Sequence, residues 1–192
     1  MFIVNIFIRD AYGTNMRAFV VGRFQPFHNG HMGSVKYVLE EFDDIIIGIG
    51  SAQYSHTPEN PFTGGERHLM ISRALEKEGI TRYYLVPVTD VNQYGLWVAH
   101  VELLIPPFEA IFSNNPLSLR LFSEKGYRAE TMPLYNREKC SGANIRKLMV
   151  EDGNWEDYVP SEVARTLNEI DGINRLKDLC TPVHGEDVVG RG

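Results

Sequence analysis

Two histidines, His28 and His31, stand three residues apart in the stretch VGRFQPFHNGHMG at positions 21–33, with Gly30 between them. An apolar run typical of a buried strand precedes them, and an amphipathic pattern typical of a helix follows. A helix N-terminus attracts phosphate because it carries unpaired N–H groups and the positive end of the helix dipole. Both imidazoles would share one face of the first turn, with Asn29 as the expected N-cap. The spacing therefore predicts a phosphate-binding site.

Other interpretations of the same histidines stay open. A single histidine at a helix start is more often a capping or surface residue, and this holds for either one taken alone. Zinc would need a third protein ligand, and no Cys, Asp or Glu lies close in sequence. We therefore favour a clamp for phosphate, with Arg23 and Gln25 just upstream as helpers, and we predict no metal held by protein side chains.

A second candidate anion site lies at SGANIRK, residues 141–147. Ser141 and Gly142 stand where a cap and an anion-accepting turn would be, and Arg146 follows one helical turn later. An ordinary capped helix with a surface arginine is the alternative. Together with the histidine pair, the segment is more consistent with a second helix N-terminus facing the same phosphates.

Trp97 ends the stretch TDVNQYGLW, residues 89–97. An indole face such as that of Trp97 favours a planar cation by stacking and cation–π attraction. The periodicity alone is nearly as compatible with Trp97 as core filler. Ser51 ends an apolar run, and the loop from there to residue 62 could close over a nucleotide. Asn115 is a further candidate contact.

The elements that must position these residues alternate regularly along the chain. Such alternation predicts a Rossmann-like α/β fold, with a parallel sheet, helices on both faces and a small C-terminal helical subdomain. Ligands bind at the carboxyl ends of the strands in these sheets. Thr63 and Glu66 have the spacing of a capping box, and Gly79 stands where a helix would stop. We expect strands over 17–22, 44–50, 82–88, 109–113 and 127–132, and helices over 30–42, 63–79, 96–104, 116–125, 143–151, 160–170 and 173–180.

The expected organisation is one domain with additions at both ends. Residues 1–15 are either an extension that the fold does not need or an extra edge strand. Residues 16–141 form the α/β domain, 142–180 its helical part, and 181–192 a flexible tail.

Composition narrows the functional classes. The chain has 192 residues, 43% of them hydrophobic, and a formal charge of −6, which argues against a non-specific nucleic-acid or membrane binder. Cys140 and Cys180 are the only cysteines, so a disulfide scaffold is not expected and a reducing, cytoplasmic location is. No apolar run approaches the ~20 residues that cross a bilayer.

H-x-G-H after a first strand resembles the signature of the nucleotidyltransferase superfamily, which class I aminoacyl-tRNA synthetases share. The longer string GRFQPFHNGH is similar to archaeal-type nicotinamide-nucleotide adenylyltransferases. The likeness continues through IGIGSAQYSHTPENPFTGGER, LWVAHVELLIPPF, SNNPL and SGANIRKLM, and it covers roughly residues 17–180. It implies transfer of AMP from ATP to nicotinamide mononucleotide, giving NAD and pyrophosphate by direct in-line attack. It also implies Mg²⁺ bound through the phosphates of ATP, and a hexamer.

The resemblance also implies site residues. Two positions depart from the family pattern, because Ala143 replaces a hydroxyl residue and Tyr94 replaces an asparagine. The implied set is His28, His31 and Arg146 for catalysis; Gly22, Arg23, Phe24, Gln25, Gly30, Asn115, Ser141, Gly142 and Ile145 for ATP; and Ser51, Asn92 and Trp97 for nicotinamide mononucleotide.

Three other functions are weighed against this one. Transferases of the same superfamily that act on pantetheine phosphate or flavin mononucleotide typically open with a GTFD-like strand end, whereas this chain has GRFQ. A tRNA synthetase fragment would need a K-M-S-K-S-like loop and a basic surface. A regulatory protein that binds nucleotides without turnover is opposed by the intact histidines and Arg146, and a turnover assay would decide.

Overall fold

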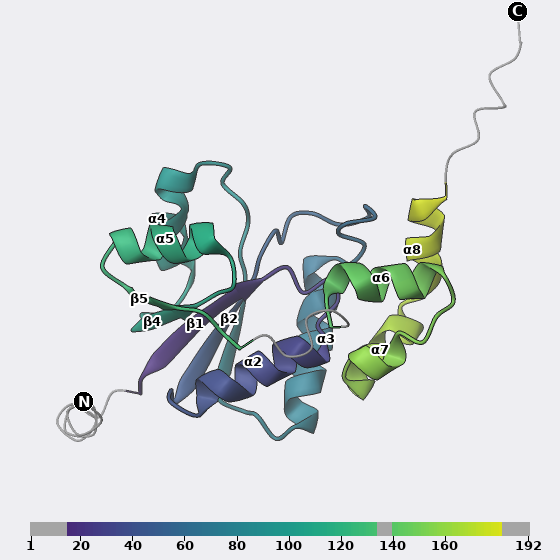
Figure 1. Ribbon diagram of the computed structural model, residues 1–192, viewed down its shortest axis with the longest axis horizontal. Coiled ribbons are helices and arrows are strands. Elements are labelled where there is room, and N and C mark those ends of the chain that lie inside the picture. The colour runs from purple at the N-terminus through teal and green to yellow at the C-terminus, as the bar shows by residue number, and fades with distance from the viewer. Residues whose placement is uncertain (1–14, 134–139, 182–192) are drawn as a thin grey trace, which may run out of the picture.

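The computed structural model describes residues 15–133 and 140–181 (Figure 1). The expectations for residues 1–14 and 182–192 lie outside these ranges. Of the expected N-terminal extension, only Asn15 is described, and its side-chain amide donates to Asp44 Oδ2 at 3.1 Å. Among the described residues, no helix is long and apolar enough to cross a membrane.

A five-stranded parallel sheet forms the centre, with strand order β3-β2-β1-β4-β5. This confirms the predicted Rossmann-like α/β class. The order reverses between β1 and β4, which is where such sheets open a crevice at their carboxyl edge. The strands are β1 (Arg17–Gly22), β2 (Asp44–Ile49), β3 (Tyr83–Pro87), β4 (Ala110–Phe112) and β5 (Arg128–Glu130).

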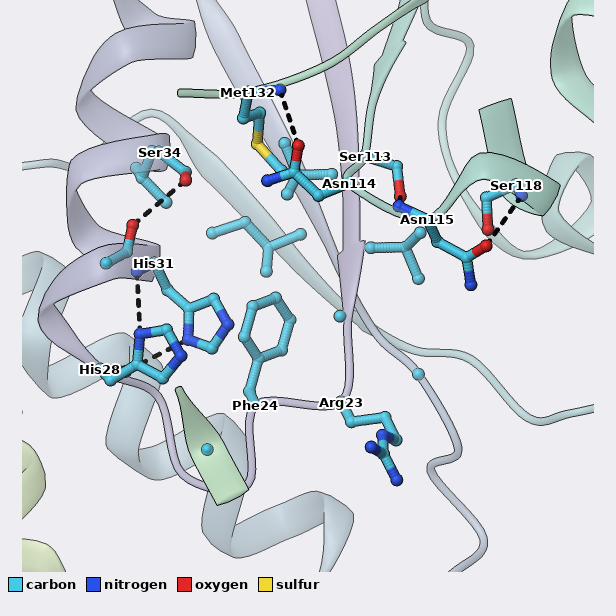
Figure 2. Close-up of a pocket in the computed structure, with 18 of the residues that line it drawn as sticks. Arg23, Phe24, His28, His31, Ser34, Ser113, Asn114, Asn115, Ser118 and Met132 are labelled. Atoms are coloured by element: carbon cyan, nitrogen blue, oxygen red, sulfur yellow. Dashed lines mark hydrogen bonds between the residues drawn. The ribbon is translucent and has the colours of Figure 1, made fainter. Parts of the chain in front are cut away.

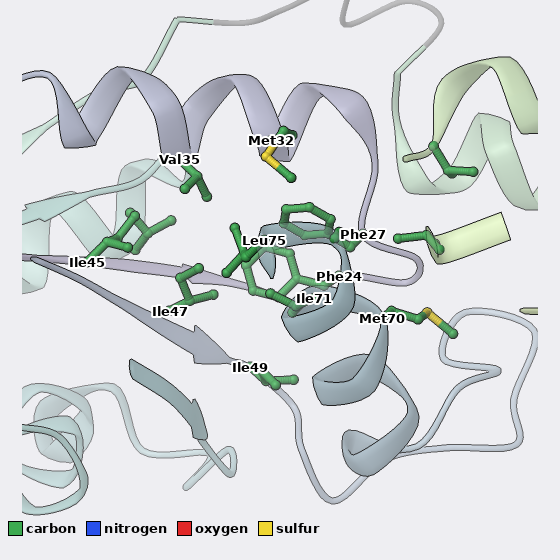
Figure 3. Close-up of a cluster of buried hydrophobic side chains, with 14 of the residues drawn as sticks. Phe24, Phe27, Met32, Val35, Ile45, Ile47, Ile49, Met70, Ile71 and Leu75 are labelled. Atoms are coloured by element: carbon green, nitrogen blue, oxygen red, sulfur yellow. The ribbon is translucent and has the colours of Figure 1, made fainter. Parts of the chain in front are cut away.

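Helices cover both faces of the sheet, as expected (Figure 1). Alternate residues of each strand point to opposite faces, so Val20 and Ile47 join one core cluster while Phe19 and Ile46 join the other. The first cluster lies under α2 and α3, and Figure 3 shows Phe27, Met32 and Leu75 closing over the sheet there. These helices are α2 (Asn29–Leu39) and α3 (Gly64–Lys77) on one face, and α4 (Trp97–Leu104) and α5 (Pro116–Glu124) on the other.

Three helices follow the sheet in the chain and pack on the α3 side of the molecule. They are α6 (Gly142–Val150), α7 (Ser161–Glu169) and α8 (Gly172–Cys180), and two 3₁₀ turns, η1 (Tyr94–Leu96) and η2 (Glu156–Tyr158), complete the described elements. Helix α7 lies against α3. Arg175 of α8 holds both carboxylate oxygens of Glu66 at 2.8 Å. These helices thereby join the start of α3.

Local rules account for most helix boundaries. Thr63 and Glu66 form the predicted capping box at the start of α3, with bonds of 3.1 and 2.8 Å. Gly79 follows its end with φ +71°, a conformation that favours glycine. Helix α2 ends at Leu39, three residues earlier than expected. Phe42 led to the longer prediction because it is apolar at helical spacing. It is buried, but it lies in the turn after the helix.

Candidate active site

The start of α2 is organised by the two histidines themselves. His28 is the N-cap, and its Nδ1 accepts the backbone N–H of His31 at 3.2 Å. His31 Nδ1 in turn accepts the backbone N–H of His28 at 3.2 Å. The prediction that Asn29 caps this helix is therefore wrong. Asn29 is its first residue, and its side chain donates to the carbonyl of Asp157 at 3.0 Å.

This reciprocal capping fixes the tautomer of both rings. A nitrogen that accepts a backbone N–H carries no proton itself, so the proton of each neutral imidazole sits on Nε2. The two rings stack with centroids 3.5 Å apart and an interplanar angle of 14°. The pair therefore presents two adjacent N–H donors from one helix start, as Figure 2 shows for the ring positions.

Burial keeps the histidine pair uncharged at neutral pH. Desolvation lowers the pKa of His28 to about 4, although its own backbone hydrogen bond opposes the shift. Desolvation, and then the proximity of His28, lowers the pKa of His31 well below its usual range. Phe24 meets the His31 ring edge-on at 4.8 Å, and Phe27 stacks on it at 5.5 Å. The histidines are therefore neutral donors here, and positive charge must come from elsewhere.

A cavity of about 550 Å³ opens at the carboxyl ends of β1, β2 and β4, where the strand order predicts a ligand. Figure 2 shows the histidines and Phe24 on one side of it, and Asn114 and Asn115 across from them. Most of the predicted site residues line this cavity: Gly22, Arg23, Phe24, His28, Gly30, His31, Ser51, Trp97, Asn115, Ser141 and Gly142.

Three helix N-termini surround this cavity, one more than the sequence suggested. Besides α2, the N-cap Ser141 of α6 accepts from Asn144 N at 3.3 Å. The third is α5, where Asn115 is the N-cap and accepts from Leu117 N at 2.9 Å. Since each N-terminus carries partial positive charge, the cavity is suited to a polyanion.

Four predicted residues do not line this cavity: Gln25, Ile145, Arg146 and Asn92, of which Asn92 lines a second cavity described below. The Gln25 side-chain amide bonds to the backbone of Phe62. It donates to the Phe62 carbonyl at 2.8 Å and accepts the Phe62 N–H at 3.0 Å. Ile145 is fully buried in the core. Arg146 donates from Nη1 to the Gln25 carbonyl at 2.7 Å, and it lines a separate pocket beside Lys147.

The loop between β1 and α2 gathers positive charge. Burial, and then repulsion from Arg23, lowers the pKa of both Arg67 and Arg146. Gly142 allows this crowding, because a Cβ there would lie 3.0 Å from the Gln25 carbonyl and 3.2 Å from Arg146 Nη1. The positive charges of these guanidinium groups repel one another, and an anion bound between them would offset that repulsion.

Arg67 is the main residue that sequence reasoning missed. It is fully buried, and its guanidinium donates to the carbonyls of Arg23 and Gly50 at 2.8 Å and of Ser51 at 3.2 Å. It thereby ties together the turns after β1 and β2. A signal was present, because Arg67 shares the helical stripe of the buried Met70 and Ala74.

A second cavity of about 280 Å³ adjoins the first and shares Asp90, Trp97, Asn115 and Ser118 with it. The predicted Asn92 lies here. Trp97 lines both cavities while also packing on the core, which is compatible with either interpretation of this residue. Asp90, Ser113 and Asn114 also line the site and were not singled out from the sequence.

Within the described ranges, no cluster of three or more His, Cys, Asp or Glu side chains could hold a metal ion.

The parallel sheet, the histidine pair at the end of its first strand and the converging helix N-termini define a nucleotidyltransferase of the H-x-G-H type. Comparison with known sequences makes this specific. The chain belongs to the cytidylyltransferase-like family, whose pattern matches residues 19–148, and within it to the archaeal nicotinamide-nucleotide adenylyltransferases.

Two relatives show how similar the sequences are. The chain is 60% identical over 164 residues to the nicotinamide-nucleotide adenylyltransferase of Picrophilus torridus, covering 85% of this chain and 97% of that protein. It is 57% identical over 165 residues to that of Thermoplasma volcanium, covering 86% and 93%.

Among solved structures, a bifunctional NMN adenylyltransferase/ADP ribose pyrophosphatase from Francisella tularensis, complexed with AMP and a manganese ion, has a similar fold. The TM-score is 0.69 at 20% identity, and the match covers 86% of this chain but 52% of that longer one. At this identity the likeness supports the fold alone.

Proposed function

We propose that this protein transfers AMP from ATP to nicotinamide mononucleotide, giving NAD and pyrophosphate. The observation that supports this proposal best is the histidine pair, whose reciprocal capping leaves two Nε2–H donors beside a cavity of about 550 Å³. The identity of 57–60% to enzymes named for this activity supports the same conclusion.

The reaction needs no nucleophile from the protein. A phosphate oxygen of the mononucleotide attacks the α-phosphorus of ATP, and the bond from that phosphorus to the β-phosphate oxygen breaks in line with it. Pyrophosphate leaves with the electron pair, so no covalent enzyme intermediate forms. Because the attacking oxygen is already anionic, positioning and stabilisation of charge are the work left to the protein.

We assign the residues to that work as follows. His28 and His31 donate from Nε2 to phosphate oxygens, with the backbone at the start of α2. Ser141 and Gly142 bring the N-terminus of α6 to the triphosphate, while Arg23 supplies full positive charge. Arg146 donates one N–H to the Gln25 carbonyl, and its guanidinium has further N–H donors for phosphate oxygens.

Mg²⁺, when bound, would neutralise charge on the triphosphate and its leaving group. The described residues are consistent with an ion held by phosphate and water, since they form no ligand cluster of their own. A chelator should therefore abolish turnover without lowering the thermal midpoint, and added Mg²⁺ should restore activity.

The direct test is pyrophosphate release from ATP with a panel of acceptors. Nicotinamide mononucleotide should support turnover far better than flavin mononucleotide or pantetheine phosphate. Equal or better rates with either of those would reject the assignment. Binding of nucleotides without turnover would instead identify a regulatory protein that lost catalysis.

We also propose that the protein works as a homo-oligomer, a hexamer by resemblance, in the cytoplasm. Both of its cysteines are free thiols, which suits a reducing compartment. Leu103 on α4 is 86% exposed and Leu96 on η1 is 54% exposed, so a second copy could cover them. Light scattering in solution would give the mass.

A further inference from the structure

The proposed phosphate site is divided between two parts of the fold. The histidine pair and Arg23 follow β1, whereas Ser141, Gly142 and Arg146 belong to the start of α6. Helices α6, α7 and α8 lie together beside α3 (Figure 1). Both parts must face the same triphosphate, and a misplacement of about 1 Å can cost roughly 10²-fold in rate. A contact that fixes one part relative to the other therefore matters to the transfer step.

Arg175 of α8 connects the two parts through several hydrogen bonds. Its Nη1 and Nη2 each donate to one carboxylate oxygen of Glu66, in the first turn of α3, at 2.8 Å. Nη1 also donates to the carbonyl of Pro61 at 3.4 Å, and Nη2 to that of Ile170 at 3.3 Å. The Arg175 and Glu66 side chains are 23% and 18% exposed, so water screens them less than a surface pair. Their bidentate geometry fixes orientation as well as distance.

The segment that Arg175 holds from one side is held by Gln25 from the other. Gln25 Nε2 donates to the Phe62 carbonyl at 2.8 Å, and Gln25 Oε1 accepts the Phe62 N–H at 3.0 Å. The backbone carbonyl of the same Gln25 accepts from Arg146 Nη1 at 2.7 Å. The contacts of Arg175 are thereby linked to the place of the Arg146 guanidinium through residues 61–62 and 25.

The residue next to Glu66 holds the other part of the site. Arg67 donates to the carbonyls of Arg23 and Gly50, both at 2.8 Å. Two consecutive residues of α3 thus bind in two directions, Glu66 to α8 and Arg67 to the turns after β1 and β2. Helix α8 in turn packs against α6. The first turn of α3 is therefore the common reference for both parts of the phosphate site.

We propose that Arg175, paired with Glu66, is a positioning residue for the transfer reaction, fixing Arg146 and the N-terminus of α6 at the triphosphate. The inference rests on the proposed function and deepens it. Arg175 acts through Arg146 and needs no contact with a substrate. Loss of its ion pair should therefore weaken contacts with the pyrophosphate part of ATP, while the contacts of the acceptor remain.

The test measures KM for every substrate in Arg175→Gln, in the forward direction and in the reverse one, in which pyrophosphate and NAD give ATP and nicotinamide mononucleotide. Glu66 keeps its capping bonds with Thr63 in this variant. The KM values for ATP and pyrophosphate should each rise about tenfold, the effect of losing one well-placed charge-assisted hydrogen bond. Those for nicotinamide mononucleotide and NAD should stay within about twofold, because their binding does not depend on the pyrophosphate contacts.

Two milder variants test the same idea even if Arg175→Gln folds poorly. Arg175→Lys keeps the charge, but an ammonium cannot reproduce the fork that holds both Glu66 oxygens. Glu66→Gln removes the charge and keeps an acceptor for the Thr63 N–H. Each should raise the KM for ATP and for pyrophosphate by about threefold, an intermediate effect.

Arg73→Gln is the matched control. Arg73 lies about two turns further along α3, and it donates to Glu169 and Thr166 of α7 at 2.5 and 3.0 Å. Its side chain is 28% exposed, similar to that of Arg175. The control therefore removes another ion pair between α3 and the C-terminal helices, and it should lower the thermal midpoint by a similar amount. It should leave the KM for ATP and for pyrophosphate within about twofold.

The outcomes separate this inference from the function on which it rests. Unchanged KM values for ATP and pyrophosphate in folded Arg175→Gln would overturn the positioning role. An equal rise in all the KM values, or the same rise in Arg73→Gln, would also overturn it, because general loosening of the fold does not distinguish the substrates. Each of these results leaves the adenylyltransferase assignment intact. Absence of turnover in the wild-type protein would reject the proposed function itself.

Discussion

Acidification should destabilise this protein through its histidine pair. The pKa of His28 is about 4 in the folded chain, against 6.5 for a free histidine, because burial disfavours the imidazolium. As the pH falls below 6.5 the unfolded chain takes up a proton that the folded chain resists, so unfolding is favoured. The contribution of His28 is fully present above pH 6.5 and is lost progressively as the pH falls to about 4.

The size of the effect follows from that difference. Each pKa unit corresponds to about 1.4 kcal/mol, so complete protonation of His28 costs about 3 kcal/mol, of which about 2 kcal/mol is lost between pH ~7 and ~5. The shift of His31 has the same direction and adds to it. Burial raises the pKa of Glu66, but its contacts with Arg175 and Thr63 outweigh burial and hold the pKa below its ordinary value.

Urea unfolding at the two pH values measures this loss. The control is His28→Asn, which keeps an N-cap acceptor but does not titrate. The free energy of unfolding of the variant should fall by about 2 kcal/mol less than that of the wild type over the same interval. If both proteins lose the same amount, His28 is not held neutral by the fold.

Activity should respond differently from stability. A neutral Nε2–H donor keeps its proton as the pH rises through 6.5, so kcat should not fall there, whereas an imidazolium donor would be lost. Replacing either histidine by Ala should lower kcat by roughly 10²–10³, as for one preorganised donor to a developing oxyanion. A decline of kcat as the pH rises through 6.5, or near-full kcat in folded Ala variants, would contradict neutral donors.

Three further changes test other parts of the structure. Arg67→Met should cost about 3–5 kcal/mol of unfolding free energy in urea, because it leaves buried carbonyls unpaired; a loss below about 1 kcal/mol would contradict this. Trp97→Ala should weaken acceptor binding by ~1–3 kcal/mol while the KM for ATP changes little; if both KM values rise together, Trp97 acts mainly as core. Leu103→Glu should lower the mass seen by light scattering at an unchanged thermal midpoint, and an unchanged mass would remove α4 from the interface.

The sheet could be predicted because its sequence signals are local. All six residues of β2 are buried, so the strand appears in sequence as an uninterrupted apolar run. The capping box of Thr63 and Glu66 likewise lies within four consecutive residues. The alternation predicts a parallel sheet, and the histidine pair lies at its carboxyl edge because it directly follows the first strand.

The cap of α2 could not be predicted in the same way. Asn is among the preferred N-caps and His is not, so local rules favoured Asn29. His28 is the cap because its ring and the His31 ring each accept the other residue's backbone N–H. The Asn29 side chain instead donates to the carbonyl of Asp157, far along the chain. That second contact has no signal near residue 29.

The contacts of two predicted site residues could not be derived from the sequence for a related reason. Gln25 and Arg146 match motif positions, but the Gln25 amide bonds to Phe62, 37 residues away, and one Arg146 N–H bonds to the Gln25 carbonyl, 121 residues away. A motif gives the type of residue at a position. Which of its donors remain for a ligand depends on contacts that only the folded chain makes.

Arg67 shows how the scaffold keeps the site in one arrangement before any ligand arrives. Phe24 and Ser51, after β1 and β2, have φ of +51° and +50°, a region that costs a bulky or polar residue about 1–3 kcal/mol. Arg67 donates to the carbonyl preceding each of them, at Arg23 and Gly50, and to that of Ser51 itself. One buried guanidinium thus holds both strained turns against the same helix. These turns place Phe24 against His31 and Ser51 at the cavity. The hydrogen bonds from Arg67 offset their strain during folding. The binding free energy of the substrates is therefore not needed to form the turns and remains available for the transfer step.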